Sequence, residues 1–319
     1  MKVEFVKDLK EGQHIRDEFI VASVSKCASD KGKAYLNIKL QDKTGSLDAK
    51  KWDVSDRDLQ LIVPGAVLEV EGDVNSYRDQ LQLKVLMVDE VIEELVDISD
   101  FKKVSPIPLD EMKAKLANYL KSFKDPDVSL IVNEVIKRFY DKYVTYPAAV
   151  RIHHEFGSGI IHHSLAMADL AEAVAKLYPQ VDRDILVAGA IIHDVGKTIE
   201  YKDLPVPEQT VEGKLCGHIA IMYAEFKAIC AELIKDGKIK PTSEVPLLLE
   251  HMILAHHGQL EFGSPVLPST REALLLSMID LLDSRMMVLD KAYDNVEPGN
   301  FTEKIWSMDN VSFYKPKER

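Results

Sequence analysis

The sequence contains little cysteine and no long hydrophobic run. Its three cysteines, Cys27, Cys216 and Cys230, lie far apart and form no CxxC pair. This argues against a disulfide framework and a thiolate zinc site, and it is typical of a reducing compartment. No apolar stretch approaches the ~20 residues that span a bilayer, and the charged first residues lack the apolar core of a secretion signal. We therefore expect a cytoplasmic protein without a membrane partner.

Basic residues are fewer than acidic ones, with 40 Lys and Arg against 52 Asp and Glu and a net charge of −12. Such a balance argues against indiscriminate coating of nucleic acid, which normally requires basic surface. The segment from Lys26 to Lys51 is an exception, with seven lysines against three aspartates, so a local basic groove remains compatible with the composition. The length of 319 residues indicates about two domains, each with its own core.

The first ninety or so residues show the two-residue alternation of β-strands. Residues 34–41 and 80–85 alternate apolar and polar side chains, and segments 19–27, 45–53 and 66–74 also resemble strands. Five short strands separated by turns suit a small closed barrel, and the oligonucleotide-binding (OB) barrel is the commonest five-stranded case. Another small barrel or a sandwich is the alternative. The side chains expected to face inward are Ala34, Leu36, Ile38, Leu40, Leu81, Leu83 and Val85.

The remainder of the chain is helical in pattern. Charges and prolines over 98–108 break the β alternation and indicate a linker. Beyond it, apolar residues recur at three- and four-residue spacing. The helices are expected at 109–123, 127–143, 160–177, 183–194, 217–235, 244–256 and 270–292. We therefore predict a multidomain protein with an OB-type barrel over 1–97, followed by an all-α domain over 109–319.

Histidines are concentrated in the helical part. Nine of the ten lie between His153 and His257. A single buried histidine is usually a hydrogen-bonded core residue, but three His-His doublets and a His-Asp pair in one third of the chain are hard to explain in that way. Imidazole and carboxylate ligands without thiolate favour divalent ions such as zinc, manganese or iron.

Four residues on three expected helices form a candidate ligand set: His163, His193, Asp194 and Asp280. Of the adjacent His162 and His163, we expect the second to be the ligand. Asp280 lies in an otherwise apolar helical stretch, where an ionised carboxylate is costly unless it is paired or bound to metal. After Asp194, Gly196 would allow the chain to turn so that Lys197 faces the same site. Asp283, on nearly the same helix face as Asp280, either orients a ligand or forms a surface salt bridge.

This pattern resembles that of the HD-domain phosphohydrolases. Their extended motif, HDxGK, is present here as HDVGK at 193–197. An OB barrel ahead of such a domain is similar to the YhaM-type bacterial 3′→5′ exoribonucleases. The strings that carry the resemblance are YPAAVRIHHEFGSGIIHHS, LYPQVDRDILVAGAIIHDVGK, EGKLCGHI, HHGQLEFGSP and SFYKPK, and they extend over nearly the whole chain.

The resemblance implies a metal-dependent exonuclease acting on single-stranded RNA. It implies that His218, His256 and His257 hold a second ion, with Asp194 between the two, and that manganese is the working metal. Two ions can activate water and neutralise charge on the phosphate, with Lys197 stabilising the charge that develops there. Whether single-stranded DNA is also a substrate, and whether the chain forms a homo-oligomer, stay open.

Substrate contacts are expected in both domains. His153 and His154 precede Gly157-Ser158-Gly159, where a phosphate could approach the backbone, although plain loop packing is an equal alternative. On the barrel, lysines would follow the phosphates while aromatic rings stack on bases. The candidates there are Lys33, Tyr35, Lys51, Trp52, Tyr77 and Arg78, and Trp52 could equally be a core residue.

Two other functions fit the sequence. HD sites also serve nucleotidases and cyclic-nucleotide phosphodiesterases, but such enzymes have no obvious need for a basic, aromatic-bearing barrel. A non-catalytic single-strand-binding protein is the second alternative, and the intact ligand set with Lys197 argues against it.

Overall fold

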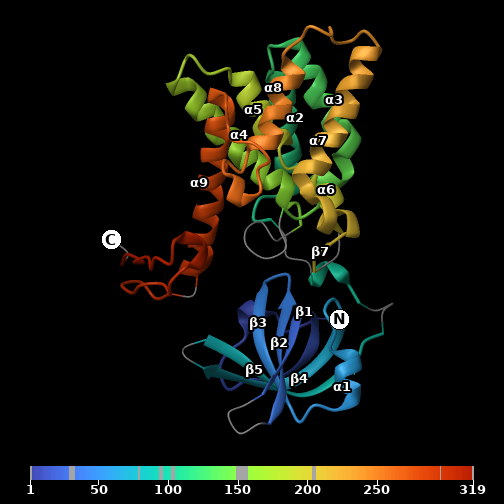
Figure 1. Ribbon diagram of the computed structural model, residues 1–319. Helices are drawn as coiled ribbons and strands as arrows, with labels where there is room; N and C mark the ends of the chain where they lie inside the picture. Colours follow the sequence, from blue (N-terminus) through green and yellow to red (C-terminus); the bar gives the residue numbers. More distant parts are fainter. Residues whose placement is uncertain are drawn as a thin grey trace. The chain divides into compact units, whose positions relative to one another are not determined.

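The computed structural model divides into two compact units, one formed by residues 1–104 and the other by almost all of the chain from Ser105 onward (Figure 1). The residues it describes are 2–28, 33–77, 80–92, 96–101, 105–148, 157–202, 206–294 and 296–317.

The first unit is a closed five-stranded barrel with strand order β1-β2-β3-β5-β4. Neighbouring strands are antiparallel except β3 and β5, which are parallel. A short helix, α1 (Asp56–Leu61), connects β3 to β4 and begins with a capping box at Ser55. The strands are β1 (His14–Ala28), β2 (Ala34–Asp42), β3 (Gly45–Trp52), β4 (Val67–Tyr77) and β5 (Gln80–Glu90). The prediction of a five-stranded OB-type barrel is confirmed.

The alternating pattern predicts the barrel core well except at strand ends. Leu36, Ile38 and Leu83 are each at most 3% exposed. Ala34 and Leu81, which we expected to face inward, are exposed. These two predictions were wrong: both residues lie in the first two positions of a strand, before the buried positions of that strand begin.

A buried ion pair lies in the barrel unit, between Lys2 and Asp42. The side chains of both are fully buried, with Nζ 3.5 Å from the carboxylate Oδ2. Lys2 also donates to the Glu18 carbonyl oxygen at 2.6 Å and its Nζ lies 3.5 Å from the centroid of the Phe19 ring. Asp42 in turn accepts a hydrogen bond from the Val6 backbone N–H. These contacts fix the N-terminal segment to the barrel.

The second unit packs long helices around a single apolar core (Figure 1). Its helices are α2 (Leu109–Ser122), α3 (Pro126–Thr145), α4 (Gly159–Leu177), α5 (Arg183–Ile192), α6 (Lys197–Glu200), α7 (Val211–Lys235), α8 (Val245–Ala255) and α9 (Arg271–Tyr293). A two-stranded hairpin of β6 (Tyr201–Lys202) and β7 (Glu208–Gln209) lies between α6 and α7. No helix among the residues described above is long and apolar enough to cross a membrane.

Helix α7 differs from the sequence prediction. It begins at Val211 instead of residue 217, and its N-cap Thr210 accepts from the Gly213 N–H. Gly217 interrupts it with a φ of 71°, a left-handed conformation that glycine adopts readily. Two glycines within five residues weaken a helical pattern, which is why the first turns were missed.

Helix α5 determines where the polar residues of this unit lie. Every residue from Asp184 to Ile192 is buried. At Gly189 the helix backbone packs closely on its neighbours, because an added Cβ would lie 2.2 Å from the methyl carbon of Met252. The chain that follows α5 therefore emerges inside the unit rather than at its surface.

Candidate metal centre and barrel binding face

The end of α5 delivers adjacent His193 and Asp194 into the interior, where they are 0% and 2% exposed. Gly196, two residues on, has ordinary helical dihedrals, so the turn does not need glycine for its conformation, contrary to our expectation. It needs glycine for space. An added Cβ would lie 2.2 Å from the carbonyl oxygen of His218 on α7. The HDVGK segment is thus packed directly against the helix that supplies another histidine.

Asp194 lies between two groups of imidazoles. Its Oδ2 is 3.7 Å from Nε2 of His163 and 3.4 Å from Nε2 of His193. Its Oδ1 is 3.4 Å from Nε2 of His218 and 3.7 Å from Nε2 of His256. One carboxylate oxygen therefore faces each group.

The remaining predicted ligands complete the two groups. Asp280 on α9 brings Oδ1 to 3.3 Å from Nε2 of His163. Potential ligand atoms of His163, His193 and Asp280 lie within 4.8 Å of one another, as do those of His218, His256 and His257. The structure thus brings together all seven residues that the sequence analysis selected as metal ligands.

The other ring nitrogen of each histidine is held by an oxygen atom. Nδ1 of His193, His256 and His257 lies at hydrogen-bond distance from a backbone carbonyl, at 3.1, 2.7 and 2.7 Å respectively. A carbonyl only accepts, so Nδ1 carries the proton and Nε2 presents a lone pair. Nδ1 of His163 is similarly 2.7 Å from Oδ2 of Asp283. Asp283 thereby touches a candidate ligand, as one of its two expected roles requires.

Glu200 lies beside Nδ1 of His218 as an ion-pair partner and was missed by the sequence analysis. Its Oε2 lies 2.9 Å from Nδ1 of His218, while Oε1 accepts from the Gln209 amide at 2.9 Å. Gly213 leaves room for this arrangement, since an added Cβ would lie 2.4 Å from the Glu200 carbonyl oxygen. The only sequence signal was an acidic residue soon after HDVGK, which does not indicate its partner.

The electrostatics of the cluster favour ionised carboxylates. Burial alone would raise the pKa of Asp194, but the Lys197 ammonium and the His193 imidazole hold it well below its usual range. Burial acts to lower the pKa of His163, yet its hydrogen bonds with Asp280 and Asp283 raise it to about 9. Without a cation, the proton held on His163 offsets part of the acidic charge.

The donor set fits divalent cations. Oδ1 of Asp194 and Nε2 of His218 and His256 are buried and form no hydrogen bond with any residue that the structure describes. Buried polar atoms without partners are costly, and three such atoms facing one another are readily satisfied by a shared metal ion. Imidazole nitrogen with carboxylate oxygen suits zinc, manganese and iron.

Lys197 is turned towards Asp194 rather than into open space. Its Nζ donates to Oδ2 at 2.6 Å, and both side chains are nearly fully buried. Two other histidines of the region lie outside the cluster. His162 contacts the Ser105 hydroxyl through Nδ1 at 2.8 Å, and Nε2 of His251 accepts from the Ser269 N–H at 2.8 Å. His153, His154 and Arg78 fall outside the residues that the structure describes.

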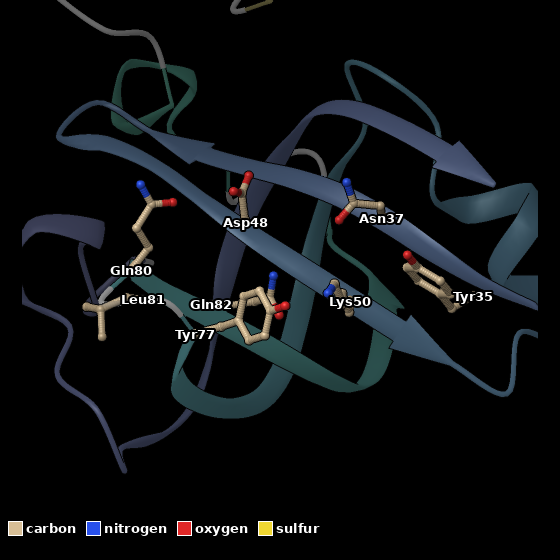
Figure 2. A pocket seen from close by; sticks show the side chains of 8 residues that line it. All are labelled: Tyr35, Asn37, Asp48, Lys50, Tyr77, Gln80, Leu81 and Gln82. Carbon is tan, nitrogen blue, oxygen red and sulfur yellow. The ribbon is translucent and has the colours of Figure 1, made fainter. Parts of the chain in front are cut away.

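The barrel candidates divide between two faces. The rings of Tyr35 and Trp52 stack with centroids 4.5 Å apart, and Tyr77 is 57% exposed. Lys50, which was not predicted, lies between Tyr35 and Tyr77 (Figure 2). Lys51 points to the opposite face of β3, where Nζ donates to the Leu86 carbonyl at 3.1 Å. The prediction that Lys51 lies beside the rings was therefore wrong, and Lys50 is the lysine in that position.

Lys33 forms an ion pair with Asp53 at 2.6 Å, with both side chains mostly exposed. An exposed pair of this kind contributes little to stability.

Comparison with known proteins agrees with both units. Residues 20–91 match the OB-fold nucleic acid binding domain family, and residues 160–285 match the HD domain family. The 3′-5′ exoribonuclease YhaM of Bacillus subtilis (strain 168) is 40% identical over 306 residues, covering 96% of each chain. The chain belongs to the YhaM family. The 3′-5′ exoribonuclease YhaM of Geobacillus sp. (strain WCH70) is 40% identical over 96% of this chain and 93% of its own. That of Bacillus pumilus (strain SAFR-032) is 38% identical over 96% of each chain.

The resemblance stated from the motifs is therefore confirmed. A solved structure, the second OB-fold domain of replication protein A from Methanococcus maripaludis, covers 30% of this chain and all of its own, at 19% identity and a TM-score of 0.24. That score is too low to support an argument.

Proposed function

We propose that this protein is a 3′→5′ exoribonuclease that hydrolyses single-stranded RNA from its 3′ end, using two divalent ions bound in the helical unit. The observation that carries the proposal is the position of Asp194, whose two oxygens each face a separate group of imidazole nitrogens. Membership of the YhaM family supports the choice of RNA and of direction. Zinc, manganese and iron all accept this ligand set, and manganese is our choice because the resemblance to the YhaM-type enzymes implies it.

When bound, a pair of divalent ions supplies an activated water and neutralises charge on the phosphate. The protein's part is to hold the ligands. Asp283 and Glu200 lie beside Nδ1 of His163 and His218. A carboxylate there would keep the proton on Nδ1, orient each ring and strengthen Nε2 as a metal ligand. Lys197, whose ammonium pairs with Asp194, would stabilise the charge that develops on the phosphate.

The barrel would hold the strand that feeds the site. Tyr35 and Tyr77 supply stacking surfaces on one face, with Lys50 between them. Aromatic stacking tolerates any base and contributes ~1–3 kcal/mol for each base. We further propose single-stranded DNA as a weaker substrate, since stacking does not need the ribose hydroxyl, and a cytoplasmic location, since the three cysteines are unpaired.

The test compares substrate classes on the purified protein with manganese. The substrates are 5′-labelled single-stranded RNA, a matched DNA, a deoxynucleoside triphosphate and a cyclic nucleotide. We expect a ladder of RNA products that shortens from the 3′ end, and little turnover of the two small molecules. Preferred hydrolysis of either small molecule would instead indicate a nucleotidase or a cyclic-nucleotide phosphodiesterase. RNA binding without any hydrolysis would indicate a binding protein.

A further inference from the structure

The outer face of the barrel contains a polar pocket of about 280 Å³ (Figure 2). Its wall includes the two tyrosine rings, but most of the lining is polar and takes no part in stacking. Its polar lining includes Asn37, Asp48, Lys50 and Gln82. They come from β2, β3 and β5.

The strand register makes these four side chains neighbours. Asn37 on β2 is the cross-strand partner of Lys50 on β3. Asp48, two residues before Lys50, is the partner of Gln82 on the parallel strand β5. Because side chains alternate between faces with a period of two, all four project from the same face of the sheet. Figure 2 shows them with the tyrosines at the pocket.

The pocket joins stacking surfaces to charged groups of opposite sign. Nζ of Lys50 lies 5.7 Å from the centroid of the Tyr35 ring and 5.3 Å from that of Tyr77. A base stacked on either ring therefore has its edge within reach of the ammonium. The Asp48 carboxylate projects from the next position on the same face of β3. In the described part of the chain, neither the carboxylate nor the Asn37 and Gln82 amides pair with another protein group.

Guanine is the base whose edges match this arrangement. Its O6 and N7 accept hydrogen bonds and are the usual targets of lysine or arginine. Its N1–H and exocyclic amine both donate, so one carboxylate can accept from both. Adenine has only its N6 amine as a donor and lacks the O6 acceptor, and cytosine has only its N4 amine. Uracil has a single N3–H between two carbonyl oxygens, so none of the three donates twice to one carboxylate. The neutral amides of Asn37 and Gln82 can adapt to either donors or acceptors.

We propose that this pocket reads guanine in single-stranded RNA, with Asp48 accepting from N1–H and the exocyclic amine, Lys50 donating to O6 or N7, and a tyrosine ring stacking on the base. The inference rests on the proposed function, because it requires RNA on this face. It adds a sequence preference that stacking alone does not give. An exonuclease with such a pocket would hold strands that carry a guanine more tightly than strands that lack one.

The test measures binding with the full-length chain carrying Asp194→Asn, with manganese present, so that RNA is not consumed. The probes are a 5′-labelled twelve-nucleotide oligouridine and the same strand with one central guanosine, inosine or 7-deazaguanosine, read by fluorescence anisotropy. We expect guanosine to tighten binding about tenfold and inosine, which lacks the amine, to lose most of that gain. 7-Deazaguanosine reports whether Lys50 uses N7 or O6.

Asp48→Asn should remove the preference for guanosine and leave the affinity for oligouridine within about twofold, since a single rim charge mainly affects selectivity. The matched control is Glu90→Gln, which makes the same charge change on exposed β5 residue 90, away from the pocket. Equal binding of all four strands, or a preference that survives Asp48→Asn or is lost in Glu90→Gln, would overturn the inference.

RNA hydrolysis by the wild-type chain is measured in parallel. Hydrolysis without a guanosine preference would defeat the pocket assignment alone. Failure both to bind and to hydrolyse RNA would defeat the proposed function and the pocket together.

Discussion

The two units use buried charge in opposite ways. In the barrel unit, the buried Lys2 and Asp42 pair with each other and with nearby backbone groups. In the helical unit, Oδ1 of Asp194 and Nε2 of His218 and His256 are buried, yet no described residue forms a hydrogen bond with them. The first arrangement is complete without a ligand. The second leaves buried ligand atoms that a bound cation would satisfy, and this contrast separates a structural ion pair from a candidate metal centre.

The functional surfaces differ in the same way. The barrel presents Tyr77 and Lys50 on its outer face, where losing a side chain costs the fold little. The helical unit places its ligands in the core, at the ends and faces of five helices. We therefore expect changes in the barrel to alter binding and changes in the helical centre to alter turnover, and the following experiments test that separation.

Metal removal should have the largest effect. With a chelator present, we expect RNA hydrolysis to fall by more than about three orders of magnitude, because metal binding lowers the pKa of water from about 15.7 to about 7. Binding of RNA to the barrel should change less than about threefold. Product ladders and anisotropy on the same RNA measure the two quantities, and added manganese should restore hydrolysis. Undiminished RNA hydrolysis in chelator would show that the helical centre does not depend on metal and would contradict the separation of binding from turnover.

Asp283→Asn and Glu200→Gln should each weaken metal binding by about 10- to 100-fold, because they lose the carboxylate that orients His163 or His218. Calorimetric titration with manganese measures this directly, and each change should weaken a different one of two binding events. Asp290→Asn, an exposed position on the same helix as Asp283, is the control. Wild-type affinities in both variants would show that these carboxylates only support packing.

Tyr77→Ala should weaken binding of long RNA by about 5- to 150-fold, the equivalent of losing one stacked base at ~1–3 kcal/mol. Turnover of a dinucleotide, which is too short to need the barrel face, should stay unchanged. Tyr178→Ala, at an exposed position of the helical unit, is the matched control for binding. An equal loss on both substrates would mean that the barrel does not act separately.

Asp184→Asn should produce the smallest effect, on stability alone. Burial acts to raise the pKa of Asp184, but the Asp125 backbone N–H and the Arg183 guanidinium lower it further than burial raises it. A carboxyl with a lowered pKa stabilises the folded state above its unfolded pKa of about 3.9, and that contribution is lost as the pH falls through the folded value. We expect a cost of about 1–3 kcal/mol at pH 7, shrinking below about pH 4.

Urea unfolding of the wild type and the variant at several pH values measures this difference. Asp141→Asn, an exposed position on α3, provides the control, which should show no pH-dependent difference. A constant gap between Asp184→Asn and wild type from pH 7 to pH 3 would contradict the assignment.

Local pattern was sufficient for most of the secondary structure. Alternation predicted β2 and the buried part of β5, and helical spacing predicted α4 to within a residue at its start. It failed where the local signal was absent or misleading, at the exposed strand ends and at the first turns of α7. The seven candidate ligands were also selected from the sequence, partly by their motif and partly by resemblance.

The sequence by itself determined the residue types, the order of the elements and the pairing of His193 with Asp194. Only the tertiary structure decided which atoms meet. The contact of His163 with Asp283 joins residues 120 positions apart, and that of Glu200 with His218 depends on the close approach of α7 at Gly196 and Gly213. Spacing along the chain specifies the face of one helix, whereas a distance between two helices is set by the packing of all their side chains.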